Sequence, residues 1–550
     1  MWETRMFGRR PFTYDGETLK LTFAPVIPGY LVGKDLKVSA MFLGKTKVVY
    51  HLSGQRDFYP GNYEIAEIEI AYRNRSRMHS RGSIEVDSAR MIRDGLAETI
   101  FTMRMKKIVT CEQKHEFWKE QELTVCEQPG EMQVVSIYPQ VTYQTIDGFG
   151  GAFTEASAHT YMGCSDAKKK EMIEAYFGKD GLRYNIGRIH MNSCDFALGN
   201  YTYIEDWDAE LKTFSIAHDE KEILPFLTDA IEKRKETYGE DLTFLVSPWS
   251  PPAFMKTNGE MNHGGKLKKE YYATWAAYFV KFIQAYRAKG INIRALTVQN
   301  EPAAVQTWDS CVYTTEEEAE FVGNYLGEAL EKAGLSDVDI FVWDHNKEIL
   351  FERFGTCIQN EKAAKYIKGA AVHWYTGDHF EAIEMVQKQY PGTKVIFSEG
   401  CVEYSRFADT KETAKAEMYA HDMIGNFRAG LSAYLDWNLI LDMEGGPNHV
   451  DNFCAAPILC DPKNDTFDKR LAYYYIGQFS RYIKKEAVRI ATTRYTDALD
   501  VCGFLNPDGS RVIVVLNKGD KPVDMTLRED GMGVKETVEA HSIATYILEE

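Results

Sequence analysis

The segment IRALTVQNEP, residues 293–302, is the most informative starting point, because its apolar run stops at three consecutive polar or turn-forming residues. Ile293–Gln299 has the length and composition of a buried strand. Asn300, Glu301 and Pro302 follow it directly. Proline disfavours helical backbone in the residue before it, so we expect Glu301 to continue the edge of this strand in an extended conformation.

Amphipathic helices are expected on both sides of this strand. A helix from about Lys268 to Lys289 places aromatic residues on one face and is followed by glycine. On the other side, Thr315 and Glu318 match a capping box that begins a second helix, which ends at Gly334. A strand between two such helices is typical of a βαβ unit.

The same alternation recurs across residues 146–480, which we take as the catalytic domain. Its eight strand-like runs predict a (β/α)8 TIM barrel. An open doubly wound sheet is the structural alternative, although no GxGxxG motif follows the first run. The eight expected strands are 146–153, 184–189, 243–247, 293–299, 338–343, 369–374, 394–398 and 431–437.

The segments that flank the barrel are β-rich. After the barrel, residues 481–550 contain Asn506–Ser510 between two apolar runs, which indicates a β-hairpin. We expect this region to form a β-sandwich to which residues 105–145 contribute strands.

The N-terminal segment, residues 1–104, differs from the rest because it carries a net charge of +4. Its alternating runs predict an extra β-rich unit. A second interpretation places the natural start at Met103 or Met105 and leaves the earlier residues poorly structured.

Composition excludes several classes of protein. The net charge of −17 disfavours binding to nucleic acid and to anionic membrane surfaces. The chain contains no run of about 18 apolar residues, so the sequence predicts no membrane span. The N-terminus lacks the apolar core of a secretory signal. The ten cysteines form no CxxC pair, so a zinc ribbon is not expected. With no export signal, we expect a cytoplasmic protein with reduced thiols.

Two glutamates occupy equivalent places on two strands. Glu301 follows the fourth predicted strand, and Glu399 follows the seventh. Barrel enzymes carry their active sites at the C-terminal ends of the strands, and strands four and seven face each other across the barrel. Two facing carboxyl groups suit glycoside hydrolysis, because one protonates the leaving oxygen and the other attacks. Burial and mutual repulsion should raise the pKa of one of them and make it the acid.

Seven motifs, in order, resemble glycoside hydrolase family 30 of the two-glutamate barrel clan, which includes the glucosylceramidases. The resemblance covers roughly residues 120–550 and excludes residues 1–104. The motifs are Asp147–Glu155, Ser193–Phe196, Ser247–Trp249 with Met255–Gly259, Asn300–Pro302, Val372–Tyr375, Ser398–Cys401, and Asp436–Asn438 with Glu444–Asn448.

This resemblance implies a role for each matching residue. Glu301 would be the acid/base and Glu399 the nucleophile of a retaining mechanism, and no metal or cofactor would be needed. We also expect Trp308 and Tyr313, on the loop after strand four, to line the leaving-group site. The other residues that the resemblance implies are Glu155, Trp249, Asn300, Tyr375, Trp437 and Asn452 for substrate binding, and Arg188 and His373 as supports.

The resemblance implies an exo-acting β-glycosidase that releases β-linked glucose from a small-molecule or oligosaccharide glycoside. Glu155 departs from the pattern, because the glucosylceramidases have aspartate there, which leaves the exact sugar open. A β-xylosidase and a β-1,6-glucanase are alternatives within the family. A non-catalytic carbohydrate-binding protein would be expected to lack one of the two glutamates, and both are present. The oligomeric state is open.

Overall fold

The chain divides into two units, residues 1–103 with residue 550, and residues 104–549. In the first unit, the described residues form three antiparallel strand pairs: β1 (Phe12–Tyr14) with β2 (Leu19–Leu21), β3 (Lys37–Phe42) with β4 (Thr46–His51), and β5 (Ile68–Ala71) with β6 (Arg77–Ser80). Most of the predicted segment 1–104 lies outside the described residues. The computed structural model describes residues 12–14, 19–21, 27, 31, 37–42, 46–51, 68–71, 77–80, 104–127 and 129–549.

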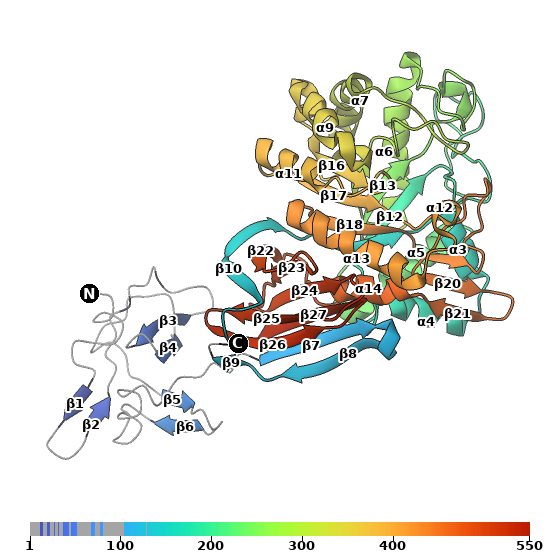
Figure 1. Cartoon of the computed structure of the whole chain (residues 1–550). Coiled ribbons are helices and arrows are strands. Elements are labelled where there is room, and N and C mark those ends of the chain that lie inside the picture. The colour runs from blue at the N-terminus through green and yellow to red at the C-terminus, as the bar shows by residue number, and fades with distance from the viewer. Residues whose placement is uncertain are drawn as a thin grey trace. The chain divides into compact units, whose positions relative to one another are not determined.

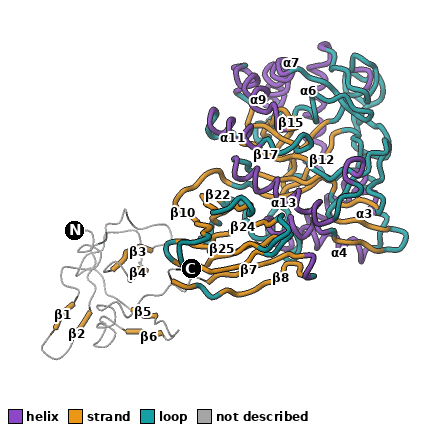
Figure 2. The backbone as a smooth tube through the Cα atoms, in the orientation of Figure 1, coloured by secondary structure: helices purple, strands orange, loops and turns teal. Residues whose placement is uncertain are grey.

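Eight parallel strands close into a barrel in the larger unit (Figures 1 and 2). Each strand pairs with the next one in sequence, and the last pairs with the first to close the ring. The predicted TIM barrel is therefore confirmed, and the open doubly wound sheet is wrong. The strands are β11 (Gly148–Ala152), β12 (Ile186–Met191), β13 (Thr243–Pro248), β14 (Ile293–Thr297), β15 (Asp339–Asn346), β16 (Ile367–His373), β17 (Lys394–Glu399) and β18 (Ala433–Asn438).

Apolar side chains from five strands meet inside the barrel, among them Leu245, Phe341 and Ile396. Strand β11 is glycine-rich because its neighbour β12 runs very close to it. A Cβ atom on Gly150 would lie 1.9 Å from the carbonyl oxygen of Ile186, so no larger residue fits there.

Helices connect the barrel strands and surround them (Figure 2). No helix among the described residues is both long enough and apolar enough to cross a membrane. The helices are α3 (Glu155–Met162), α4 (Asp166–Phe177), α5 (Ile223–Tyr238), α6 (Tyr272–Ala288), α7 (Thr315–Phe321), α8 (Gly327–Lys332), α9 (Leu350–Gln359), α10 (Glu361–Ala364), α11 (Phe380–Gln389), α12 (Tyr404–Phe407), α13 (Glu412–Ala429) and α14 (Leu471–Ser480); a π-helical turn, Val322–Leu326, joins α7 to α8.

The capping box of α7 lies one residue earlier than predicted. Thr314 is the N-cap, its hydroxyl accepts from the Glu317 N–H, and the Glu317 side chain accepts from the Thr314 N–H. The predicted box on Thr315 and Glu318 is therefore wrong. Glu318 is instead fully buried.

Ten strands outside the barrel form one continuous sheet, to which the N-terminal and C-terminal parts of the larger unit both contribute. The predicted hairpin is present as β23 and β24. The strands are β7 (Arg104–Cys111), β8 (Glu116–Leu123), β9 (Cys126–Glu127), β10 (Val134–Thr145), β22 (Val488–Arg494), β23 (Asp500–Leu505), β24 (Arg511–Asn517), β25 (Val523–Glu529), β26 (Met532–Val538) and β27 (Ser542–Glu549). A separate three-stranded sheet contains β19 (Ile440–Asp442), β20 (Ile458–Asp461) and β21 (Thr466–Lys469).

Strand β15 contains a bulge that is held by a buried ion pair. Trp343 and Asp344 have φ angles of +77° and +48°, and the pairing register with β16 shifts at this point. The Glu318 carboxylate accepts the Trp343 N–H at 2.9 Å and pairs with Arg353 at 3.0 Å. The Arg353 guanidinium in turn lies over the Trp343 ring, 4.6 Å from its centre.

We expect the substitution Glu318→Gln to destabilise the fold by about 3 kcal/mol, because it leaves the buried Arg353 charge without its counterion. Urea unfolding followed by tryptophan fluorescence measures this loss. Glu328→Gln is the matched control, because Glu328 forms an exposed ion pair with Lys332 within helix α8. Equal unfolding midpoints for the two variants would contradict a structural role for the buried pair.

Candidate active site

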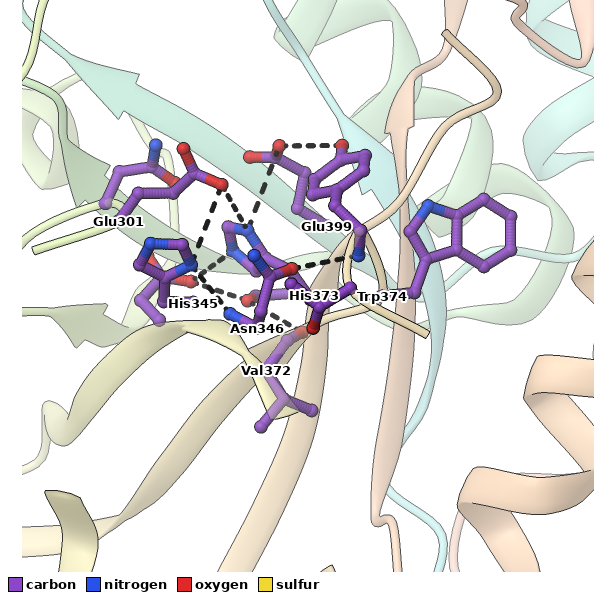
Figure 3. A network of polar contacts seen from close by, with 12 residues as sticks. Glu301, His345, Asn346, Val372, His373, Trp374 and Glu399 are labelled. Atoms are coloured by element: carbon purple, nitrogen blue, oxygen red, sulfur yellow. Dashed lines mark hydrogen bonds and ion pairs between the residues drawn. The ribbon is translucent and has the colours of Figure 1, made fainter. Parts of the chain in front are cut away.

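Glu301 and Glu399 lie at the C-terminal ends of strands and point toward one another (Figure 3). Glu399 is the last residue of β17, whereas Glu301 lies four residues beyond the end of β14. The Glu301 backbone has a φ of +47° and donates its N–H to the carbonyl of Asp344 at 2.9 Å. The expectation of an extended backbone before Pro302 is therefore wrong, because this left-handed turn and the bond to β15 override the preference.

The nucleophile predicted from the resemblance, Glu399, is held by two strong donors. Arg188 donates to its Oε2 at 2.6 Å, and the Tyr375 hydroxyl donates to its Oε1 at 2.9 Å. The Glu399 carboxyl is 6% exposed, so these two contacts fix its orientation in a nearly dry environment.

The other glutamate, Glu301, has looser contacts. Gln306 donates its amide to Oε2 at 3.1 Å, and His373 Nδ1 lies 3.4 Å from Oε1. His345 Nδ1 lies 3.9 Å away, but it already accepts the Asn346 N–H, so it is not available to donate to Glu301. Gln306 was not predicted, because nothing in the sequence orients the loop after β14; His345, at the end of β15, was expected only to pair with Asp344.

A single imidazole lies between both carboxylates. His373 Nδ1 is 3.4 Å from Glu301 and 4.0 Å from Glu399, while its Nε2 faces Asp344 at 3.1 Å. Both ring nitrogens thus face carboxylate oxygens, which only accept hydrogen bonds from the ionised state, so the geometry favours the doubly protonated ring. Burial lowers the pKa of His373, but the charge of Glu399 and the bonds to Asp344 and Glu301 raise it to about 9.

The pKa values of the two glutamates move in opposite directions. Burial raises the pKa of Glu399, with a further contribution from the charge of Glu301. Burial also acts on Glu301, but the hydrogen bond and charge of His373 lower its pKa to about 2. We expected burial and repulsion to raise the pKa of the acid, Glu301, and keep it protonated. That expectation is not met, because the pKa of Glu301 is lowered. The raised pKa of His373 and the carboxylates facing both of its ring nitrogens favour a proton on this ring.

Ligand atoms of Glu301, His373 and Glu399 all lie within 4.8 Å of one another. Their spacing would suit a metal ion, but Arg188 already places a fixed positive charge on Glu399. Freedom from metals and cofactors stays a prediction. The same upper limit is compatible with the roughly 5–5.5 Å that separates the carboxyl groups of retaining glycosidases.

Arg188 joins the two strand-end motifs. It is fully buried, and besides Glu399 it donates to the Asn300 amide oxygen at 2.8 Å and to Asp344 at 2.9 Å. Its guanidinium lies 4.8 Å from the ring of Trp249 and 5.5 Å from that of Trp437. These two rings stack with centroids 5.3 Å apart, so they form one aromatic wall beside the carboxylates.

Next to this wall lies a buried carboxyl group that the sequence interpretation did not assign. Asp195 accepts the Asn452 amide at 3.0 Å. Burial, together with the charge of Glu399, raises the pKa of Asp195 to about 8. The motif Ser193–Phe196 was part of the resemblance, so the signal was present, but spacing alone did not distinguish this aspartate from a structural one.

Glu155, Trp308 and Tyr313 were all predicted to contact substrate, but the structure gives them three different surroundings. Both oxygens of Glu155 are engaged by the protein, one by His218 at 2.6 Å and one by the Leu198 N–H at 2.8 Å. Trp308 packs against the cluster that contains the aromatic wall. Tyr313 is buried in the core between the barrel and its helices, so the structure does not bring its side chain to the carboxylates.

Comparison with known proteins agrees with this geometry. Residues 146–483 match the family model described as glycosyl hydrolase family 30 TIM-barrel domain, and residues 486–546 match the family 30 beta sandwich domain. Lysosomal acid glucosylceramidase of Mus musculus is 33% identical over 75% of this chain and 83% of its own length. An endo-1,6-beta-D-glucanase of Neurospora crassa is 28% identical over 74% of this chain and 86% of its own length.

Solved structures show the same similarity. SrfJ from Salmonella typhimurium superimposes with a TM-score of 0.79 at 38% identity, covering 82% of this chain and all of that one. The endo-beta1,6-glucanase BT3312 gives a TM-score of 0.73 at 26% identity, covering 81% of this chain and 99% of that one. With a matching barrel model, a matching sandwich model and a relative of 33% identity, the chain belongs to glycosyl hydrolase family 30 and is a glycoside hydrolase.

Proposed function

We propose that this enzyme is a retaining, exo-acting β-glycosidase that releases β-linked glucose through a covalent glycosyl-enzyme. The observation that carries the proposal is the approach of the Glu301 and Glu399 carboxylates to within 4.8 Å around His373. Such a separation leaves no room for a water molecule between a base and the sugar, which an inverting mechanism needs.

In the first step, Glu399 attacks the anomeric carbon while Glu301 gives a proton to the glycosidic oxygen. In the second step, Glu301 takes a proton from water, and the water displaces the sugar from Glu399. Glu399 suits the role of nucleophile because Arg188 and Tyr375 fix both of its oxygens. Glu301 suits acid/base work because its longer contacts leave its carboxylate free to accept a proton and pass it on.

The proton for the first step comes from His373. Transfer from its Nδ1 to Glu301 Oε1, along the 3.4 Å contact, converts an ion pair into a neutral acid and a neutral ring. The net charge of the cluster does not change, so the transfer needs no new counterion in a buried site.

The sugar would bind between the aromatic wall and Asp195, which offers a carboxyl group beside Glu399 for its hydroxyls. Asn300, whose amide is oriented by Arg188, would bind the hydroxyl next to the reacting carbon. Glu155 was expected to contact the outer hydroxyls directly. Because its oxygens are already engaged, we infer that Glu155 acts by holding Leu198, three residues after Asp195, in place.

An apolar aglycone is favoured over a soluble glucan as the leaving group. Several large apolar side chains are exposed on loops that follow barrel strands, on the side where Glu301 and Glu399 lie. Exposed apolar side chains on this side of the barrel could contact an apolar leaving group. They are Leu198, Trp207, Val305 and Met443, which are 48%, 73%, 67% and 47% exposed. A β-1,6-glucanase is the second candidate, because relatives of this chain carry that name.

Replacing each glutamate by alanine and adding azide should identify their roles. We expect Glu301→Ala to cleave nitrophenyl β-glucoside and form the glycosyl-enzyme on Glu399. Azide should then react with this intermediate and release β-glucosyl azide. For Glu399→Ala, azide should attack in place of the nucleophile and give the α-azide. Without azide, Glu399→Ala should lose at least about 10⁴-fold in kcat. NMR identifies the anomer of the glucosyl azide that each variant forms. An α-azide from Glu301→Ala and a β-azide from Glu399→Ala would reverse the roles of the two glutamates.

The pH profile should report the proton on His373. Since the raised pKa of His373 is about 9, the proton is present below that pH and lost above it. We therefore expect kcat/KM for methyl β-glucoside to fall as pH rises through about 9. Asp344→Asn removes one of the carboxylates that raise this pKa, so the alkaline limb should move to lower pH. An unmoved limb in a variant with a native circular dichroism spectrum would exclude His373 as the proton source.

An alkyl glucoside series should reveal the nature of the leaving-group site. We expect kcat/KM to rise at least about 10-fold from methyl to octyl β-glucoside, because partial burial of the chain adds binding free energy. The double substitution Leu198→Ser with Val305→Ser should flatten the series. Met385→Ser is the matched control, because Met385 is 44% exposed on the outer helix α11. A flat series together with rapid cleavage of β-1,6-glucan would instead support the second candidate.

A further inference from the structure

Two buried thiols lie against each other where the turn between α3 and α4 meets strand β20. Cys164 Sγ is 3.0 Å from Cys460 Sγ. Cys164 is 7% exposed and Cys460 is fully buried. The sulfur atoms of a disulfide are about 2.05 Å apart, so the two thiols need to approach by only about 1 Å to become bonded.

The two segments are already held together beside this pair. Ser165, the neighbour of Cys164, donates its N–H and its hydroxyl to the Asp465 carboxylate at 2.9 and 2.7 Å. Asp465 lies in the turn between β20 and β21. These bonds hold the two segments side by side, so the sulfurs need only a small further approach to form a covalent link.

We propose that Cys164 and Cys460 form an intramolecular disulfide, a covalent modification site separate from the catalytic carboxylates. The link would join helix α3, which begins at Glu155, to strand β20, which follows the loop that carries Asn452. Glu155 accepts the Leu198 N–H, and Asn452 donates to Asp195, so both segments contact residues of the proposed sugar site. The bond would therefore brace the pocket and close a chain loop between residues 164 and 460.

A small oxidant of the peroxide class supplies the chemistry. The Cys164 sulfur gives up its thiol proton, attacks one peroxide oxygen and breaks the O–O bond to become a sulfenic acid; the released proton and the leaving hydroxide form water. The Cys460 sulfur then attacks the Cys164 sulfur and expels the second oxygen as water. Two thiols and one hydrogen peroxide give one disulfide and two waters. Cys164 reacts first because it retains some exposure, whereas Cys460 has none.

A metal site is a poorer interpretation of the same pair. A zinc ion bound by two thiolates needs each sulfur at about 2.3 Å, and tetrahedral geometry then requires two further ligands. Among the described residues, neither cysteine belongs to a group of three or more side chains close enough to hold a metal. The short sulfur–sulfur distance thus favours a bond between the sulfurs.

Mild hydrogen peroxide treatment of the full-length protein tests the proposal. We expect a loss of about 2 Da in intact mass, reversible by dithiothreitol, and a melting temperature higher by about 5 °C because the cross-link restricts the unfolded chain. Trypsin leaves Cys454 and Cys460 together on the peptide 429–463. Fragment ions of the linked peptides must therefore show that Cys164 is bonded to Cys460 and not to Cys454.

Matched variants separate the cross-link from general oxidation. Cys164→Ser and Cys460→Ser should each abolish the mass loss and the thermal shift, whereas Cys357→Ser, at another buried cysteine, should keep both. Addition of oxygen to Cys164 without a cross-link would overturn the proposal, as would a link between Cys401 and Cys454 instead. A cross-link that leaves the melting temperature unchanged would overturn the bracing role. None of these results depends on which glycoside the enzyme cleaves.

Discussion

The active site depends on one guanidinium group that has no contact with solvent. Arg188 donates to Glu399, Asn300 and Asp344 at once, and its Nε donates to Ser247 at 3.1 Å. A buried carboxylate loses several kcal/mol of hydration unless a cation and further hydrogen bonds offset the loss. Arginine meets this requirement for two carboxylates, because its donors diverge in a rigid plane that lysine lacks.

The charges around Arg188 explain why the site contains one mobile proton. Three carboxylates, Glu301, Glu399 and Asp344, surround two cations, Arg188 and protonated His373. Asp344 is ionised, because Arg188 and His373 lower its pKa against the effect of burial. The remaining excess of one negative charge falls on Glu301 and Glu399, whose carboxylates both face the His373 ring. The two glutamates are chemically identical, so only their neighbours can give them the different roles that we propose.

The sequence predicted the barrel strands and helices, because these follow from the periodicity of apolar residues. It predicted much less of the backbone conformations and side-chain partners that depend on tertiary contacts. The buried strands that precede Glu301 and Glu399 were recognised because apolar runs stop sharply near both glutamates. The left-handed backbone of Glu301 was missed, because a contact with β15 determines it. The partners of Glu155 were missed for the same reason, since His218 lies 63 positions away. The cap of α7 was misplaced because two adjacent threonines precede three consecutive glutamates, so two threonine–glutamate pairs have the spacing of a capping box.

The bulge in β15 shows how far the site depends on contacts that lie outside it. Phe341 points into the barrel, so strict alternation along the strand would turn Trp343 inward and Asp344 outward toward the helices. The register shift reverses this order. Trp343 faces Glu318 and Arg353, and Asp344 enters the barrel to meet Arg188 and His373. Two residues with positive φ angles cost about 1–3 kcal/mol each. The buried ion pair behind the strand offsets that strain, so the pairing of His373 with its carboxylates depends on a contact on the opposite face of the sheet.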